Sequence, residues 1–126
     1  MQTRAMDFVA YNVTDLDRSV AFYRDILGLK LSGQWGDSFA EFEVPPTTLA
    51  LVVLPPEAQR PAPAGSGGAA VALSVPDVAA ALEELRGKNV PVLMGPMDTP
   101  VCHMALITDP DGNSVYLHYR KDGTAG

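Results

Sequence analysis

The chain has 126 residues, a length typical of one domain, and 47% of them are hydrophobic, which supplies enough apolar material for a packed core. This composition argues against an intrinsically disordered chain, which needs low hydrophobicity and high net charge. The 15 acidic and 9 basic residues give a net charge of −6, which repels phosphate backbones and argues against nucleic acid as a partner.

The first nine residues lack the basic segment and the long apolar run of a signal peptide. No later stretch approaches the roughly 20 apolar residues that are needed to cross a bilayer. We therefore expect no association with membranes and a cytoplasmic location.

The first half of the chain predicts one strand, one helix and three further strands. Asp15 stands where a helix N-cap belongs, because its carboxylate can accept hydrogen bonds from the first free helical N–H groups. Apolar residues then recur every three or four positions from Leu16 to Leu27, and Gly28 follows as a C-terminal stop. The strands are expected at residues 6–13, 29–35, 38–44 and 47–54.

A Pro-, Ala- and Gly-rich linker at about 55–68 precedes the second half, which repeats this order of elements. Asp77 is the second N-cap, and its helix ends near Gly87. The run Asp109-Pro110-Asp111-Gly112-Asn113 predicts a tight hairpin, because proline presets φ and glycine tolerates positive φ. The strands of this half are expected at residues 69–75, 90–97, 101–108 and 114–119.

The two halves are also similar in sequence at an offset of 62 residues. The identical pairs are Val9/Val71, Ala10/Ala72, Val13/Val75 and Asp15/Asp77. The duplication predicts a single α+β domain over residues 1–126, with two tandem βαβββ modules at about 6–54 and 69–120. Their two curved mixed sheets would surround a cavity. A cleft between repeated units can bury a ligand from both sides, so the ligand site is expected there.

The run from Val13 to Leu29 strongly resembles the opening of vicinal oxygen chelate proteins, a superfamily that contains glyoxalase I, extradiol dioxygenases and bleomycin-resistance proteins. The hairpin at 109–113 resembles the second hallmark of that superfamily, near the C-terminus. The resemblance covers almost the whole chain and implies the glyoxalase/bleomycin-resistance-like fold. It does not imply one reaction, because one fold carries many functions.

The resemblance also implies where a metal would bind. Metal-dependent members hold a divalent ion in the cavity through His and Glu side chains from both modules. The first-strand His of the family falls at Phe8, its counterpart in the second module at Ala70, and the last-strand Glu at Tyr116. The fourth ligand should lie within 47–54, a strand without His, Asp, Glu or Cys, in a register that the sequence leaves open. Such side chains hold a divalent ion poorly or not at all, so we expect no metal cofactor at the family's site.

A relocated metal site is the alternative. His118 lies two residues beyond Tyr116, so both should face the same side of the last strand. His103, Glu41 and Glu43 could converge with them. The competing explanations are structural hydrogen bonds for the two histidines, and a solvated strand face or a cationic ligand for the two glutamates.

Cysteine chemistry is not expected. Cys102 is the only cysteine, which excludes an intrachain disulfide and a thiolate zinc site. Cys102 and His103 are neighbours, so on a strand their side chains point in opposite directions and cannot form a nucleophile–base pair.

Aromatic residues point to a pocket for a small, partly aromatic molecule, although core packing also explains them. The expected ligand-binding residues are Phe8, Trp35, Phe39, Glu41, Tyr116 and His118. We favour a metal-free binding protein that sequesters such a molecule, and the resemblance implies a homodimer.

Two rivals remain. One is a lyase, isomerase or dioxygenase of the same superfamily, with a relocated metal or a metal-free pair such as His103 or His118 with Glu41. The other is an accessory domain whose cavity is filled by its own side chains.

Overall fold

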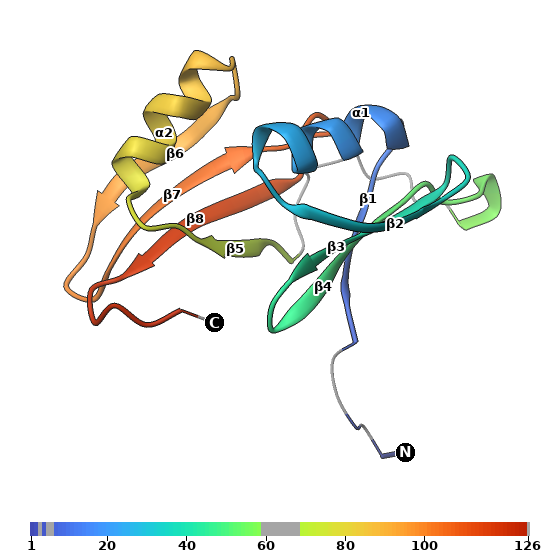
Figure 1. Ribbon diagram of the computed structural model, residues 1–126, viewed down its shortest axis with the longest axis horizontal. Helices are drawn as coiled ribbons and strands as arrows, with labels where there is room; N and C mark the ends of the chain where they lie inside the picture. The colour runs from blue at the N-terminus through green and yellow to red at the C-terminus, as the bar shows by residue number, and fades with distance from the viewer. Residues whose placement is uncertain (3, 5–6, 59–68, 126) are drawn as a thin grey trace. The chain divides into compact units, whose positions relative to one another are not determined.

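The computed structural model describes residues 1–2, 4, 7–58 and 69–125, and the chain divides into two compact units, 1–62 and 63–126. Each unit contains a four-stranded mixed sheet with a helix packed on one face (Figure 1). The predicted α+β fold of two tandem βαβββ modules is therefore confirmed. The predicted linker begins with a short 3-10 turn, η2 (Pro56–Ala58), and its residues 59–68 lie outside the described part of the chain.

The first unit has the strand order β1-β4-β3-β2. Strands β1 and β4 are neighbours in the sheet but not consecutive in the chain, and they run parallel. The other neighbouring pairs are antiparallel. The strands are β1 (Val9–Asn12), β2 (Lys30–Trp35), β3 (Phe39–Val44) and β4 (Thr47–Val52).

The core of this unit lies between the sheet and its helix. Tyr23, Phe42 and Leu51 are fully buried there. The Tyr23 ring lies 6.0 Å from that of Phe42 and 6.3 Å from that of Tyr11, measured between centroids. Aromatic rings at these separations contribute packing energy beyond their buried area, so this cluster fixes the helix on the sheet.

The first helix differs from the single regular helix that the periodicity predicts. It begins as α1 (Leu16–Ala21) and continues as a wider π-helical turn, η1 (Phe22–Ile26), in which the Leu27 N–H donates to the Phe22 carbonyl at 3.0 Å. Both Phe22 and Tyr23 are buried in this turn. Gly28 ends it with a φ of +74°, as predicted. A π-turn is a tertiary adjustment, which a 3.6-residue periodicity does not reveal.

The second unit has the equivalent strand order β5-β8-β7-β6, with β5 parallel to β8. Its helix is α2 (Val78–Gly87), and Leu82, Ile107 and Val115 are fully buried beneath it. The strands are β5 (Val71–Ser74), β6 (Val92–Asp98), β7 (Cys102–Thr108) and β8 (Ser114–Arg120).

Both predicted N-caps are present, and they yield a stability prediction. The Asp77 carboxylate accepts from the Ala80 N–H at 3.0 Å, and that of Asp15 accepts from the Arg18 N–H at 3.1 Å. Asp77→Ala should lower the free energy of unfolding by about 1 kcal/mol, because an N–H group of the first turn loses its partner. Urea denaturation measures this change. Asp37→Ala, in an exposed turn, is the control and should change stability by less than about 0.5 kcal/mol; equal losses would contradict the capping role.

Candidate functional site

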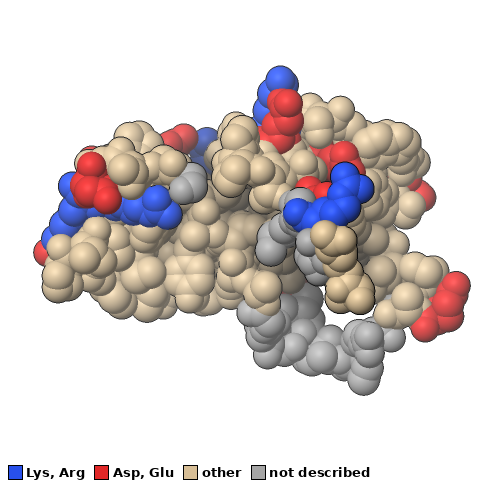
Figure 2. Space-filling model, turned by 90° about the horizontal axis from the view of Figure 1, so that it is seen from below, with Lys and Arg blue, Asp and Glu red and all other residues tan. Residues whose placement is uncertain are grey.

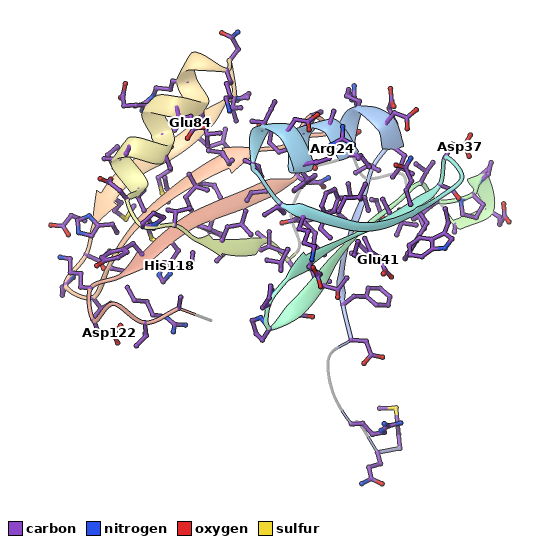
Figure 3. The ribbon with its side chains drawn as sticks, in the orientation of Figure 1. Arg24, Asp37, Glu41, Glu84, His118 and Asp122 are labelled. Atoms are coloured by element: carbon purple, nitrogen blue, oxygen red, sulfur yellow. The ribbon has the colours of Figure 1, made fainter. Side chains whose placement is uncertain are left out.

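In the first unit, one face of the sheet is left free by the helix. Along β3, Ala40 and Phe42 are buried on the helix side, so Phe39, Glu41 and Glu43 lie on the other side. Figure 3 shows Glu41 on the side of β3 away from α1. We call this side open face 1. Their shared side follows from the alternation of side chains along one strand.

Strand register arranges open face 1 in rows across the sheet. The middle row is Ala10, Ala50, Glu41 and Gly33, in the order β1, β4, β3, β2. The next row is Asn12, Val52, Phe39 and Trp35. The two cross-strand neighbours of Glu41 are Ala50, which is fully buried, and Gly33, which has no side chain.

Trp35 and Phe39 form the aromatic part of open face 1. Their ring centroids lie 5.6 Å apart, and 56% of Trp35 is exposed. The indole lies across Gly33, where an added Cβ would be 2.6 Å from the Trp35 Cη2 atom. Gly33 therefore permits the position of this ring.

The two glutamates of this face differ in their partners. Glu43 forms an ion pair with Lys30 at 2.6 Å, and its hydrogen bond raises the pKa of the lysine. The Glu41 carboxylate has no hydrogen-bond or ion-pair partner within the described part of the chain. Glu43 is thus already engaged, whereas Glu41 is available to a ligand.

Phe8 immediately precedes β1 and is half exposed. Phe8 belongs to the same unit as Trp35 and Phe39, but the aromatic contact on open face 1 is between the rings of Trp35 and Phe39.

In the second unit, Tyr116 and His118 lie on one face of β8. They alternate along the strand with Val115 and Leu117, which are buried on the other face. The prediction that they face the same side is confirmed, and Figure 3 shows His118 on the side of β8 away from α2. His118 lies between Ser74 and Met104 of the neighbouring strands.

The structure separates His103 from this group. It pairs with Tyr119 in the register of β7 and β8, whereas His118 pairs with Met104, so the two histidines point to opposite faces of the sheet. The expected convergence of His103 with His118 and Tyr116 is therefore corrected. His103 instead lies 3.7 Å from Asp98, whose pKa is lowered chiefly by a hydrogen bond from Lys121.

The register of β4 shows which of its residues is the internal equivalent of Tyr116. Ala50 pairs with Ala10 in the first unit, and Tyr116 pairs with Ala72, the residue 62 positions after Ala10, in the second. Ala50 is thus the internal equivalent of Tyr116. The resemblance and this register together imply that the four positions are Phe8, Ala50, Ala70 and Tyr116. A phenyl ring and two methyl groups cannot coordinate a metal and a single tyrosine oxygen holds one poorly, so these residues do not fit a divalent ion. Elsewhere in the described residues, no group of three or more His, Cys, Asp or Glu side chains could hold one.

A separate open pocket of about 410 Å³ lies beside the C-terminal half of α2 and the edge strand β6. It is lined by Arg86, Val90, Val92, Leu93, Met94 and Gly95. None of the predicted site residues lines it, and Arg86 is already paired with Glu83 at 3.1 Å. The residues that line this pocket form no cluster of acid, base or metal-ligating side chains.

Three neighbours of the predicted site residues were missed in the sequence: Gly33 and Ala50 beside Glu41, and Met104 beside His118. For Gly33 a signal existed, since an isolated glycine inside a predicted strand indicates a bulge or a close approach. The sheet has such an irregularity between Leu31 and Gly33. The other two depend on register between strands, which a single sequence does not specify.

Charged side chains are scattered. Figure 2 shows them in a few small groups among uncharged surface on the face it displays, so the net charge of −6 forms no single broad field among the residues coloured there. Among the helices described, none is long and apolar enough to cross a membrane.

Comparisons with known proteins agree with this architecture. The model of the family described as "Glyoxalase/Bleomycin resistance protein/Dioxygenase superfamily" matches residues 5–117. The chain is 31% identical to the lactoylglutathione lyase of Salmonella typhimurium over 90% of this chain and 91% of that protein. It is 29% identical to a probable lactoylglutathione lyase of Vibrio parahaemolyticus, over 90% and 89% of the two chains.

Solved structures have the same fold. TnmS3, an antibiotic binding protein from Streptomyces sp. CB03234, superposes with a TM-score of 0.76 at 28% identity, covering 96% of this chain and 99% of that one. A lactoylglutathione lyase from Agrobacterium tumefaciens superposes with a TM-score of 0.72 at 22% identity, covering 94% and 95%.

Proposed function

Because the chain belongs to the Glyoxalase/Bleomycin resistance protein/Dioxygenase superfamily, we propose that it is a binding protein of that superfamily which holds a small, partly aromatic molecule without a metal at the family's site. The observation that carries this proposal is the set of residues at the four ligand positions, Phe8, Ala50, Ala70 and Tyr116. Two of them are aromatic, and a ring offers a ligand apolar contact area where the family's metal ligands would offer coordination.

Open face 1 supports the proposal independently. Its Trp35–Phe39 pair presents aromatic surface on which a flat ligand can stack. The similarity to TnmS3 is in keeping with this reading, since that protein is an antibiotic binding protein. We propose that the chain sequesters its ligand and leaves it unchanged.

Metal retention tests the first part of the proposal. Untagged protein is purified without chelators, supplied with Ni, Zn, Fe, Mn and Co, desalted, and measured by inductively coupled plasma mass spectrometry. We expect retention near background, because three of the four positions carry no donor atom and a single tyrosine oxygen holds a divalent ion poorly. Near-stoichiometric retention of any one metal would contradict the proposal, and His118→Ala beside His103→Ala would then show which face of the second sheet holds the ion.

Ligand binding tests the second part. A thermal-shift screen with small aromatic compounds should raise the unfolding temperature for at least one class, because a ligand that binds only the folded state stabilises it. A screen without any stabilising compound would count against a binding function.

An enzyme is the second candidate, and the similarity to lactoylglutathione lyases favours it. Among the expected acid/base groups, His118 shares its face of β8 with Tyr116, and the Glu41 carboxylate has no hydrogen-bond or ion-pair partner among the described residues. Formation of S-lactoylglutathione from glutathione and methylglyoxal measures this activity. A rate above that of heat-denatured protein, abolished by His118→Ala, would support the lyase instead of the binder.

We also propose a homodimer, as the sequence resemblance implies, and a cytoplasmic location, as expected from the sequence. Light scattering coupled to size-exclusion chromatography would measure the mass in solution, and a monomer at all concentrations would refute the dimer.

A further inference from the structure

We propose that open face 1 recognises a flat aromatic cation, with Glu41 holding the positive charge and Trp35 stacking against the ring system. The inference rests on the proposed function, because it specifies the class of ligand that the binding protein takes. Three features of the first unit carry it.

The first feature is the position of the indole. Trp35 lies across Gly33, so that its six-membered ring covers the β2 backbone at that residue. Gly33 is directly opposite Glu41 in the register of β2 and β3. The aromatic surface and the carboxylate are therefore neighbours on the same face of the sheet.

The second feature is the availability of the carboxylate. Glu41 is half-buried and has no hydrogen-bond or ion-pair partner among the described residues, although Glu43, two residues away on the same face, is bound to Lys30. Burying a carboxylate without a partner costs free energy. A cationic or hydrogen-bond-donating ligand would supply that partner and bind more tightly than a neutral ligand that cannot donate a hydrogen bond.

The third feature is the small size of the residues in the row of Glu41. Ala10 and Ala50 carry only a methyl group, and Gly33 has no side chain, so none stands between the carboxylate and the indole that lies over Gly33. Ala50 is fully buried and Gly33 lies beneath the indole, so a planar ligand meets the exposed face of Trp35, where it can stack or form a cation–π contact. Together these features select a ligand that is flat and positively charged.

The test uses two probes of the same shape, 1-methylquinolinium, which is cationic, and 1-methylnaphthalene, which is neutral. Trp35 is the only tryptophan in the chain, so its indole N–H resonance reports on this site directly. Titration of the full chain by NMR gives both dissociation constants. We expect the cation to bind roughly tenfold more tightly than the neutral probe, as a cation–π contact and a charge pair together would give.

Three variants assign the effect. Glu41→Gln should weaken the cation roughly tenfold and leave the neutral probe unchanged. Glu43→Gln is the matched control, the same residue type on the same face with its charge already paired, and should change either affinity less than about twofold. Gly33→Ala should weaken both probes, because its Cβ displaces the indole and leaves the carboxylate in place.

Three outcomes would overturn the inference. Equal affinity for the two probes, or equal losses in the Glu41 and Glu43 variants, would show that the face binds aromatic molecules without reading their charge, and the proposed binding function would stand. If neither probe shifted the Trp35 resonance, open face 1 would not be the binding site for aromatic molecules. The thermal-shift screen, which does not depend on Trp35, would still test the binding function.

Discussion

Replacing Phe42 with alanine should lower the free energy of unfolding by about 3–5 kcal/mol, the largest effect we expect from a single substitution in this chain. Phe42 is fully buried, and its ring lies 6.0 Å from that of Tyr23, which is itself fully buried. Truncation removes apolar contacts and leaves a cavity between β3 and the first helix, because Tyr23 is held by two further rings and cannot collapse into the space. Chemical denaturation followed by circular dichroism measures the loss.

Phe39→Ala is the matched control, since it removes the same side chain from the same strand on the opposite face. Its ring contacts Trp35 on open face 1 and is only half-buried. We expect a stability loss well below that of Phe42→Ala, together with weaker binding of aromatic probes. A loss as large as that of Phe42→Ala would show that open face 1 belongs to the core of the unit and is not a ligand surface.

Asp109→Ala should lower the free energy of unfolding by about 2–4 kcal/mol, because it leaves several hydrogen-bond donors of the 109–113 hairpin without a partner. The Asp109 carboxylate accepts from the Asp111 N–H at 3.0 Å, the Asn113 N–H at 2.8 Å and the Asn113 Nδ2 at 2.9 Å. Asp109 is only 4% exposed, so water cannot replace it readily. Urea denaturation measures the change.

Asp122→Ala controls for the turn chemistry. Its carboxylate accepts from the N–H and the hydroxyl of Thr124, two residues on, at 2.9 and 2.7 Å, but it is exposed to solvent. We expect a loss below about 1 kcal/mol, because water can satisfy the released donors. Similar losses in the two variants would mean that burial of Asp109 contributes nothing to the stability of its hairpin.

Much of the fold could be predicted because its signals are local. Asp15 and Asp77 cap their helices through carboxylates three residues from the N–H groups that they accept, so short sequence windows contain both partners. Gly28 ends its helix through its own backbone conformation. The hairpin from Asp109 to Asn113 is likewise held by contacts within five residues.

The candidate site could be predicted in part, for the same reason. Alternation along a single strand places Phe39, Glu41 and Glu43 on one face, and Tyr116 with His118 on one face, without knowledge of the neighbouring strands. The residues were therefore identified correctly as neighbours within each strand. Which residues stand opposite them could not be predicted, because register across a sheet is set by long-range pairing.

The sequence by itself determined the two modules, their caps and turns, and the face that each strand residue shares with its own neighbours, because these follow from hydrogen bonds and side-chain alternation within a few residues. Only the tertiary structure decided that Ala50 is the internal equivalent of Tyr116, that His103 and His118 point to opposite faces, and that the indole of Trp35 lies over Gly33 beside Glu41. Each of these depends on which residues of different strands pair, and that is settled by packing of the whole unit.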